Sequence, residues 1–196
     1  IIVAGDGMKY DYLAIGDSIL YGYLLKTKDV WINQLAQEKN LKIRNAGQNG
    51  DTTTGMLQRF PLYLNPLPKQ IFIMGGVNDF LMGESVEKVL KNLLCMEKIA
   101  KENSLPVLFG ITHMLDERSE DFWDRSAFYK AVNQKLVLLC DELKSKDYPL
   151  IDFFSPMKKE WEKGNAQNFY IDMIHLNPLG NTFLKNVAIA SNCFVC

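Results

Sequence analysis

Short apolar runs alternate with longer amphipathic stretches along the whole chain. The apolar runs are nearly continuous rather than mixed with polar residues, which is typical of parallel strands covered on both faces. They predict strands at Tyr12–Ile15, Lys42–Asn45, Gln70–Met74, Val107–Thr112 and Leu150–Phe153. The amphipathic stretches predict helices at Val30–Lys39, Thr53–Leu64, Ser85–Asn103 and Ser126–Lys146.

Two local patterns support the predicted helices. In the segment 85–103, Val86, Val89 and Leu93 recur at helical spacing with Lys and Glu between them. Asn177 followed by Pro178 is typical of a helix N-cap with proline at the first helical position. We therefore expect a last helix that begins at Pro178 and runs toward Ala190.

Strands joined by crossover helices predict an α/β protein, in the form of a three-layer α/β/α sandwich with a parallel sheet of about five strands. The chain has 196 residues, of which 47 % are hydrophobic, and this suits one globular domain with a sizeable core. No repeat, low-complexity tract or linker divides the sequence. We therefore expect residues 8–196 to form a single domain.

Residues with possible chemical roles follow the first four predicted strands. Ser18 comes after the first strand, Gly47 after the second, Asn78 after the third and His113 after the fourth. In open α/β sheets, sites form outside the carboxyl ends of the strands. We therefore expect all four residues to gather at one edge of the sheet.

The chain termini carry few signals. Residues 1–7 precede Met8 and lack the basic start of a signal peptide. We interpret them as a vector-derived remnant before a native start at Met8, and a trimmed leader is the alternative. The four cysteines show no disulfide-framework spacing, and the C-x-x-C pair Cys193 and Cys196 is expected to be two reduced thiols on a frayed end. This pattern favours a reducing cytoplasm, whereas a leader would indicate secretion.

Composition excludes some classes of partner. The net charge is −1, the sequence pI is about 6.2, and no long block of Lys and Arg occurs. This argues against binding to nucleic acid or to anionic membranes by charge. No apolar run approaches the ~20 residues that a membrane span needs, so no stable membrane insertion is expected. The oligomeric state is not indicated.

Two segments contain the parts of a nucleophilic site. Ser18 lies on the turn that leaves the first strand, and Asp172 lies three residues before His175. A serine, a histidine and an acid together can make a hydroxyl nucleophilic. The chain has only one other histidine, His113, and no acid stands at comparable spacing before it. Hydrolysis of an ester by an activated serine is the leading hypothesis.

Four segments contain short motifs: Gly16–Gly22 with its G-D-S, Asn45–Thr52 with its glycines, Gly75–Asp79 with its G-x-N-D, and Asp172–Asn181 with its D-x-x-H. Together, and in this order along the chain, they resemble the SGNH (GDSL) hydrolases. Each block alone also has a plain structural interpretation, such as a capping turn or a loop-closing asparagine. The family often has Thr or Asn shortly after the serine, where this chain has Ile19 and Leu20.

The resemblance implies a flavodoxin-like fold and a role for each matching residue. Ser18 would be the nucleophile, His175 its base, and Asp172 the acid that orients the histidine. The backbone N–H groups of Ser18 and Gly47 and the side-chain amide of Asn78 would form the oxyanion hole. The mechanism needs no metal and no organic cofactor. Asp17 is expected to brace the serine loop rather than to act as the triad acid.

The substrate is expected to be a small-molecule acyl ester. We favour an acetyl or other short ester, with a sugar as one candidate for the alcohol portion, because the chain has little beyond its core elements. The residues expected to contact substrate are Asp17, Ile19, Phe80, His113 and Ile174. We interpret the segment 116–121 as a solvated loop over the site rather than a metal cluster, and Trp31, Trp123 and Trp161 as core or rim residues.

Two alternatives stay open. A lysophospholipase or acyl-thioesterase would be favoured by an apolar groove near Ile19, Leu20, Tyr21 and Phe80, and acyl-chain profiling would separate it from a short-chain esterase. A non-catalytic carbohydrate-binding relative of the same fold is the alternative from another class. Labelling with a fluorophosphonate serine probe would discriminate this relative from an enzyme.

Overall fold

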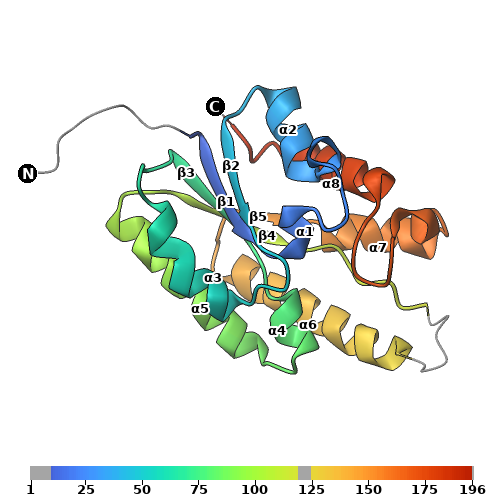
Figure 1. Ribbon diagram of the computed structural model, residues 1–196. Coiled ribbons are helices and arrows are strands. Elements are labelled where there is room, and N and C mark those ends of the chain that lie inside the picture. The colour runs from blue at the N-terminus through green and yellow to red at the C-terminus, as the bar shows by residue number, and fades with distance from the viewer. Residues whose placement is uncertain (1–9, 119–124, 196) are drawn as a thin grey trace, which may run out of the picture.

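Five parallel strands form one sheet in the order β2-β1-β3-β4-β5, with helices on both of its faces (Figure 1). The computed structural model describes residues 10–118 and 125–195, so the interpretation of residues 1–7 as a remnant or leader lies outside the described residues. The strands are β1 (Tyr12–Gly16), β2 (Ile43–Gly47), β3 (Gln70–Met74), β4 (Val107–Ile111) and β5 (Leu150–Asp152). The prediction of a parallel α/β/α sandwich is confirmed.

Helices connect and cover these strands. They are α1 (Ser18–Tyr21), α2 (Trp31–Lys39), α3 (Thr53–Arg59), α4 (Val77–Leu81), α5 (Val86–Glu102), α6 (Ser126–Ser145), α7 (Phe154–Glu162) and α8 (Pro178–Ala190), with short 3-10 helices at Thr27–Asp29, Phe60–Tyr63 and Ala166–Phe169. In Figure 1, α2, α7 and α8 lie over one face of the sheet, whereas α3, α5 and α6 lie over the other.

The predicted helix Thr53–Leu64 is two elements in the structure. Helix α3 ends at Arg59, and a 3-10 helix with Pro61 near its start follows. Proline has no N–H group to donate, and its ring clashes with the preceding turn, so the α-helix stops there. The short helices α1 and α4 were not predicted, because four or five residues give no helical period to read, and the nine-residue helix α7 was not predicted either.

Aromatic residues from both helix layers fill the core. Trp31 of α2 is fully buried, and its ring contacts Phe72 at 5.7 Å and Phe153 at 5.0 Å between centroids. Its interpretation as a core residue is therefore correct. Trp161 is half-buried, and its indole N–H donates to Asp116, while Trp123 lies outside the described residues.

The chain end packs into the molecule, so the expectation of a frayed end is wrong for residues 193–195. Phe194 is buried against Tyr12 and Phe72, at 4.9 and 5.2 Å between ring centroids. The backbone N–H of Val195 donates to the Tyr12 hydroxyl oxygen at 3.0 Å. An aromatic side chain two residues from the terminus provides enough apolar surface to order the tail.

The strand order places a switch in direction beside β1. The chain passes from β1 to β2 on one side and then crosses back to β3 on the other side. Ligands of open parallel sheets bind at such a point, outside the carboxyl ends of the strands. Ser18 directly follows β1 at this edge.

Candidate active site

Ser18 begins helix α1 on a tight turn after β1. Asp17 is the N-cap, and its carboxylate accepts a hydrogen bond from the Ile19 N–H at 2.9 Å. A side chain at Gly16 would meet the backbone oxygen of Met74 at 2.6 Å, so only glycine fits between β1 and β3 there. Burial raises the pKa of Asp17 to about 7, against the effect of the Ile19 N–H. Asp17 therefore braces the turn, as expected.

The structure brings Ser18, His175 and Asp172 into one hydrogen-bonded chain. The hydroxyl oxygen of Ser18 lies 3.0 Å from Nε2 of His175, and Nδ1 of His175 lies 2.8 Å from Oδ2 of Asp172. Ser18 and His175 are 157 residues apart in sequence. A serine oxygen, an imidazole and a carboxylate linked in this order can transfer the serine proton to the imidazole.

The carboxylate of Asp172 is held by more than the imidazole. Its Oδ1 accepts hydrogen bonds from the backbone N–H groups of Ile174 and His175, each at 2.7 Å. Partial burial opposes ionisation, but these three hydrogen bonds outweigh it and lower the pKa of Asp172 to about 2. Asp172 is therefore a carboxylate across the physiological range, as an acid that orients a histidine must be.

Two of the expected oxyanion donors have a suitable environment. The backbone N–H of Ser18 has no hydrogen-bond partner among the described residues. Asn78 lies in α4, directly after β3, and one hydrogen of its side-chain amide donates to the backbone oxygen of Asp51 at 2.9 Å. This hydrogen bond fixes the amide and leaves its second N–H hydrogen available.

Gly47 does not have such an environment, so the expectation that it donates to the oxyanion is wrong. Its N–H already donates to the side-chain oxygen of Asn45 at 2.9 Å. A side chain at Gly47 would meet the backbone nitrogen of Tyr21 at 2.4 Å, so this glycine packs against α1 and does not line a cavity. The close contact with α1 explains why glycine is required here.

Gly50, three residues further along the chain, has a more open environment. Its φ angle is +72°, and no atom lies within 4 Å of the place where its side chain would be. Two hydrogen bonds connect the turn around Gly50 to the end of β1 and to α4. The Gln48 N–H donates to the Gly16 oxygen, and the Asp51 oxygen accepts from Asn78. The sequence signal for Gly50 is its place directly before Asp51 and the helix cap Thr52.

Arg59 is a further residue that the sequence analysis missed. From the end of α3, its Nε contacts Oδ2 of Asp51 at 2.6 Å, and its Nη2 donates to the Gly16 oxygen at 3.0 Å. It therefore joins the end of β1 to the loop that carries Gly50. Nothing in its sequence position distinguishes it from a surface arginine at the end of a helix.

Several residues expected to contact substrate are buried instead. Asp17 and Phe80 are each 1 % exposed and lie outside the cavity at Ser18 and His175, whereas Ile19 is 6 % exposed and lines that small cavity. Ile19 and Phe80 belong to the hydrophobic core, while Asp17 caps α1. Ile174 is partly buried and lies in the loop of Asp172 and His175.

His113 also lies beneath the site rather than in it. It is fully buried after β4, and its Nε2 contacts the backbone oxygen of Ile174 at 2.9 Å. Burial lowers its pKa to about 4, although the hydrogen bond to Ile174 acts in the opposite direction. A neutral imidazole here supports the loop that carries His175, so the expected contact with substrate is wrong.

The segment 116–121, expected to be a solvated loop, begins with a buried residue. Asp116 is buried and accepts from Arg118 and from the Trp161 indole, so it is a structural anchor rather than part of a solvated loop. Residues 119–121 of that predicted loop lie outside the described residues. In the parts of the chain that the structure describes, no group of three or more His, Cys, Asp or Glu side chains could hold a metal ion.

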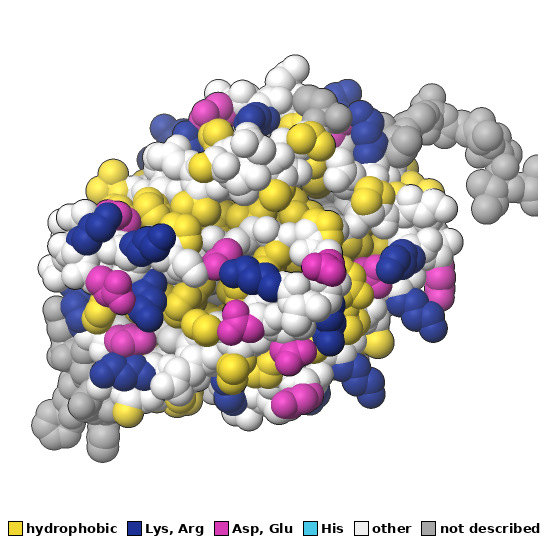
Figure 2. Space-filling view, turned by 180° about the vertical axis from the view of Figure 1, so that it is seen from behind, with side chains coloured by type: hydrophobic (Ala, Val, Ile, Leu, Met, Phe, Trp, Pro, Cys, Tyr) yellow, Lys and Arg dark blue, Asp and Glu magenta, His cyan; other side chains and the backbone are white. Residues whose placement is uncertain are grey.

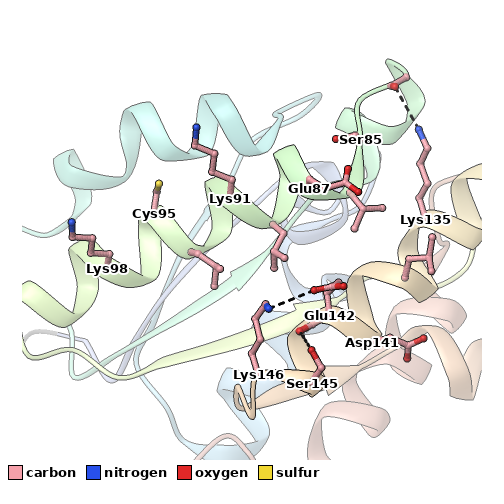
Figure 3. Close-up of a pocket in the computed structure, with 15 residues that line it drawn as sticks. Ser85, Glu87, Lys91, Cys95, Lys98, Lys135, Asp141, Glu142, Ser145 and Lys146 are labelled. Carbon is pink, nitrogen blue, oxygen red and sulfur yellow. Dashed lines mark hydrogen bonds and ion pairs between the residues drawn. The ribbon is translucent and has the colours of Figure 1, made fainter.

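A much larger cavity lies elsewhere on the surface. It is a groove of about 1060 Å³ between α5 and α6, lined by apolar residues such as Leu90, Leu94 and Leu138 and bordered by charged side chains (Figure 3). It contains no histidine and none of the triad residues. The cavity that touches Ser18 and His175 is much smaller, about 10 Å³.

On the face shown in Figure 2, acidic and basic side chains are intermixed, and no block of one sign stands out. Among residues 10–118 and 125–195, no helix is both long and apolar enough to cross a membrane.

A hydrogen-bonded serine, histidine and aspartate lie at the carboxyl edge of a parallel α/β sheet, which is the set of groups that a serine hydrolase needs. Residues 14–183 match the model of the GDSL-like Lipase/Acylhydrolase family. The chain therefore belongs to the GDSL-like lipase/acylhydrolase family.

Two curated relatives are similar to parts of the chain. An N-acylneuraminate cytidylyltransferase from Streptococcus agalactiae is 27 % identical over 145 residues, which are 72 % of this chain and 32 % of the relative. Esterase TesA from Pseudomonas aeruginosa is 34 % identical over 106 residues, which are 50 % of this chain and 53 % of that esterase. The chain thus spans about a third of the first relative and about half of the second.

Solved structures share the fold over nearly the whole chain. A member of the lipolytic G-D-S-L family from Veillonella parvula has a TM-score of 0.79 and 21 % identity, covering 94 % of this chain and 98 % of its own. An acetyl xylan esterase has a TM-score of 0.76 and 17 % identity, covering 92 % of this chain and 99 % of its own. At these identities the likeness is one of fold.

Proposed function

We propose that the chain is a serine esterase that removes a short acyl group, with acetyl as the first candidate, through a Ser18-His175-Asp172 triad. The observation that carries this proposal is the continuous hydrogen-bonded chain from the Ser18 oxygen through both ring nitrogens of His175 to Asp172. Membership of an ester-hydrolysing family supports the same reaction.

In the proposed mechanism, the Ser18 oxygen attacks the acyl carbonyl carbon while His175 Nε2 takes the hydroxyl proton. Asp172 accepts from His175 Nδ1 and stabilises the imidazolium that forms. The Ser18 and Gly50 N–H groups and the Asn78 amide hold the oxyanion. The imidazolium then gives its proton to the leaving alcohol oxygen as the ester bond breaks. A water repeats the sequence on the acyl-enzyme, which releases the acid and restores the Ser18 hydroxyl.

Burial of the residues around Ser18 supports a short acyl group. A long acyl chain needs an apolar groove beside the nucleophile, and Ile19, Leu20, Tyr21 and Phe80 are the residues expected to line it. Ile19, Leu20 and Phe80 are buried in the core, Tyr21 is 53 % exposed, and the cavity at Ser18 and His175 is only about 10 Å³. The large apolar groove lies between α5 and α6 instead (Figure 3). These observations favour a short-chain esterase over a lysophospholipase.

The relatives suggest which alcohol portion to test first. The curated relatives at 27 % identity are named for N-acylneuraminate, and one structural neighbour is an acetyl xylan esterase. Both names point to a carbohydrate. An O-acetylated N-acylneuraminate is therefore the first natural ester to test, and an acetylated neutral sugar is the second.

Rates on p-nitrophenyl acetate, butyrate and octanoate, and on an acyl-thioester, test the acyl preference, with Ser18→Ala as the control. We expect kcat/KM to be highest for acetate and to fall with chain length. A maximum at octanoate or on the thioester would favour the lipase or thioesterase alternative. If folded protein released no acetate from the p-nitrophenyl ester or from the sugar esters, this result would contradict the proposed function.

A further inference from the structure

Tyr23 is an aromatic residue that lies against the imidazole of His175. The two ring centroids are 4.4 Å apart, and the planes are inclined by 38°. Tyr23, Ser18 and His175 line the same small cavity of about 10 Å³, so little free space separates the three side chains. We propose that Tyr23 is a positioning residue that holds the His175 ring in the orientation needed to deprotonate Ser18. This inference rests on the proposed function.

The backbone brings Tyr23 to this position by a sharp turn. Gly22 ends α1 with a φ angle of +87°, and a side chain there would meet Val30 at 2.2 Å, so the turn requires glycine. The N–H of Tyr23 donates to the backbone oxygen of Ser18 at 3.1 Å. The nucleophile and the stacking ring are therefore parts of one rigid turn.

The histidine needs such a support because its other contacts constrain it incompletely. The Asp172 side chain is 47 % exposed, so water competes for the hydrogen bond that orients the imidazole. That bond and the bond to Ser18 both lie along the edge of the ring, and a ring held at two edge nitrogens can still tilt about the line between them. A ring packed against one face opposes this tilt.

The aromatic ring also suits the charged state of the histidine. During the reaction His175 becomes an imidazolium, and a cation within about 6 Å of an aromatic face is attracted by the ring quadrupole. The Tyr23 hydroxyl has no hydrogen-bond partner among the described residues. The proposed role therefore belongs to the ring and not to the hydroxyl.

Three substitutions of Tyr23 distinguish the effect of its aromatic ring from the effect of its side-chain volume. We expect Tyr23→Phe to keep kcat near wild type, Tyr23→Leu to lower kcat about tenfold, and Tyr23→Ala to lower it about 10²-fold, with KM changed little. The matched control is Tyr21→Leu, because Tyr21 is 53 % exposed and two residues earlier on the same turn, and we expect it to be near wild type.

Two readouts distinguish positioning from a structural role. The rate of Ser18 labelling by a fluorophosphonate should fall in parallel with kcat in Tyr23→Leu, because labelling also needs His175 to take the proton. In wild-type protein, proton NMR should show nuclear Overhauser effects between the Tyr23 and His175 rings. This second measurement stays decisive where a variant does not fold.

The results separate this inference from the proposed function. Wild-type activity in folded Tyr23→Leu, or absence of the ring-to-ring Overhauser effects in wild-type protein, would overturn the role of Tyr23 while the esterase assignment stands. An inactive wild-type protein whose Ser18 is not labelled would overturn the esterase assignment itself.

Discussion

A single hydroxyl at Ser18 gains its chemistry from residues that come from separate parts of the chain. The turn after β1 supplies the oxygen, the loop before α8 supplies His175 and Asp172, and α4 supplies Asn78. Each contribution depends on a few atoms. Substitutions at single residues therefore test the site most sharply.

Asn78→Ala should lower kcat by about 10²–10³ with little change in KM, because an oxyanion donor acts mainly in the transition state. Loss of its hydrogen bond to Asp51 should also lower the melting temperature. The matched control is Asn92→Ala, since Asn92 donates to the hydroxyl oxygens of Thr53 and Thr54. This control should lose stability and keep kcat. Equal kcat per titrated active site in wild type and Asn78→Ala would remove Asn78 from the oxyanion hole.

The two loop glycines should respond in different ways to the same substitution. Gly47→Ala places a Cβ against backbone atoms of Tyr21 and should cost about 1–3 kcal/mol of stability, with near-normal kcat in the folded fraction. Gly50→Ala meets no atom, costs only about 1–2 kcal/mol through its positive φ, and should lower kcat at least about tenfold by crowding the N–H donor. Urea unfolding and kcat measured on the same preparations show which variant loses stability and which loses activity. The reverse pattern would restore Gly47 to the oxyanion hole.

The residues of the triad were predictable from spacing and type, whereas their supports were not. Ser18 follows an apolar run, and Asp172 stands three residues before the one suitably placed histidine. Gly47 ends β2 and Gly50 follows it in the next turn, and only their three-dimensional surroundings distinguish them: Gly47 donates to Asn45 and packs against α1, whereas Gly50 is open. Tyr23 and Arg59 act through contacts with segments far away in sequence, and no local pattern records such contacts.

At the scale of elements, the loop of His175 rests on β4 through one buried imidazole. His113 follows β4 and contacts the Ile174 backbone oxygen, one residue before His175. The charged groups that act on it are Asp172 and His175 of the loop. Because burial lowers its pKa, the neutral form of His113 belongs to the folded protein.

This buried histidine should make stability depend on pH. Its pKa is about 4 in the folded protein and ordinarily about 6.5, so between these values the unfolded chain binds more protons. Its contribution to the free energy of unfolding should fall by about 3 kcal/mol as the pH drops from 6.5 to 4. Urea unfolding of wild type and His113→Gln across this pH range measures this contribution. If the free energy of unfolding changed with pH in the same way in both proteins, the prediction would be contradicted.

Asp17 changes the pH dependence of stability in the opposite direction, so wild type must be compared with His113→Gln. Its folded pKa of about 7 lies above its ordinary value of 3.8, because burial penalises the carboxylate. Its contribution to stability therefore falls as the pH rises from 3.8 to 7. The two trends partly cancel in wild type, and substituting His113 separates them.

The regular elements were predictable because their periods are strong, and the short ones were not. Strand β3 and helix α8 have the predicted bounds, since each follows a proline or cap signal and has a clear apolar pattern. Helices α1 and α4 consist of four and five residues and depend on tertiary contacts.

At the scale of the whole molecule, the chain end is joined to the start of the sheet. Tyr12 begins β1 and Phe194 packs on it, at the end of the strand opposite to Ser18. The tail therefore contributes to the core without touching the site.

Phe194→Ala should cost about 3–5 kcal/mol, because it removes a buried aromatic ring from contacts with Tyr12 and Phe72. Val195→Ala is the matched control: Val195 is 54 % exposed, and its loss should change stability by less than about 0.5 kcal/mol. Urea unfolding measures both, and kcat should stay near wild type in each. Equal stability of the two variants would contradict a packed tail.

Covalent labelling of Ser18 tests the central claim most directly. Wild-type protein is treated with a fluorophosphonate, and intact-mass and peptide mass spectrometry locate the adduct. The account predicts one adduct per chain, on Ser18, with labelling lost in Ser18→Ala and strongly slowed in His175→Ala, because the imidazole must take the hydroxyl proton. A folded wild-type protein with no adduct, or with its adduct on another residue, would contradict the account.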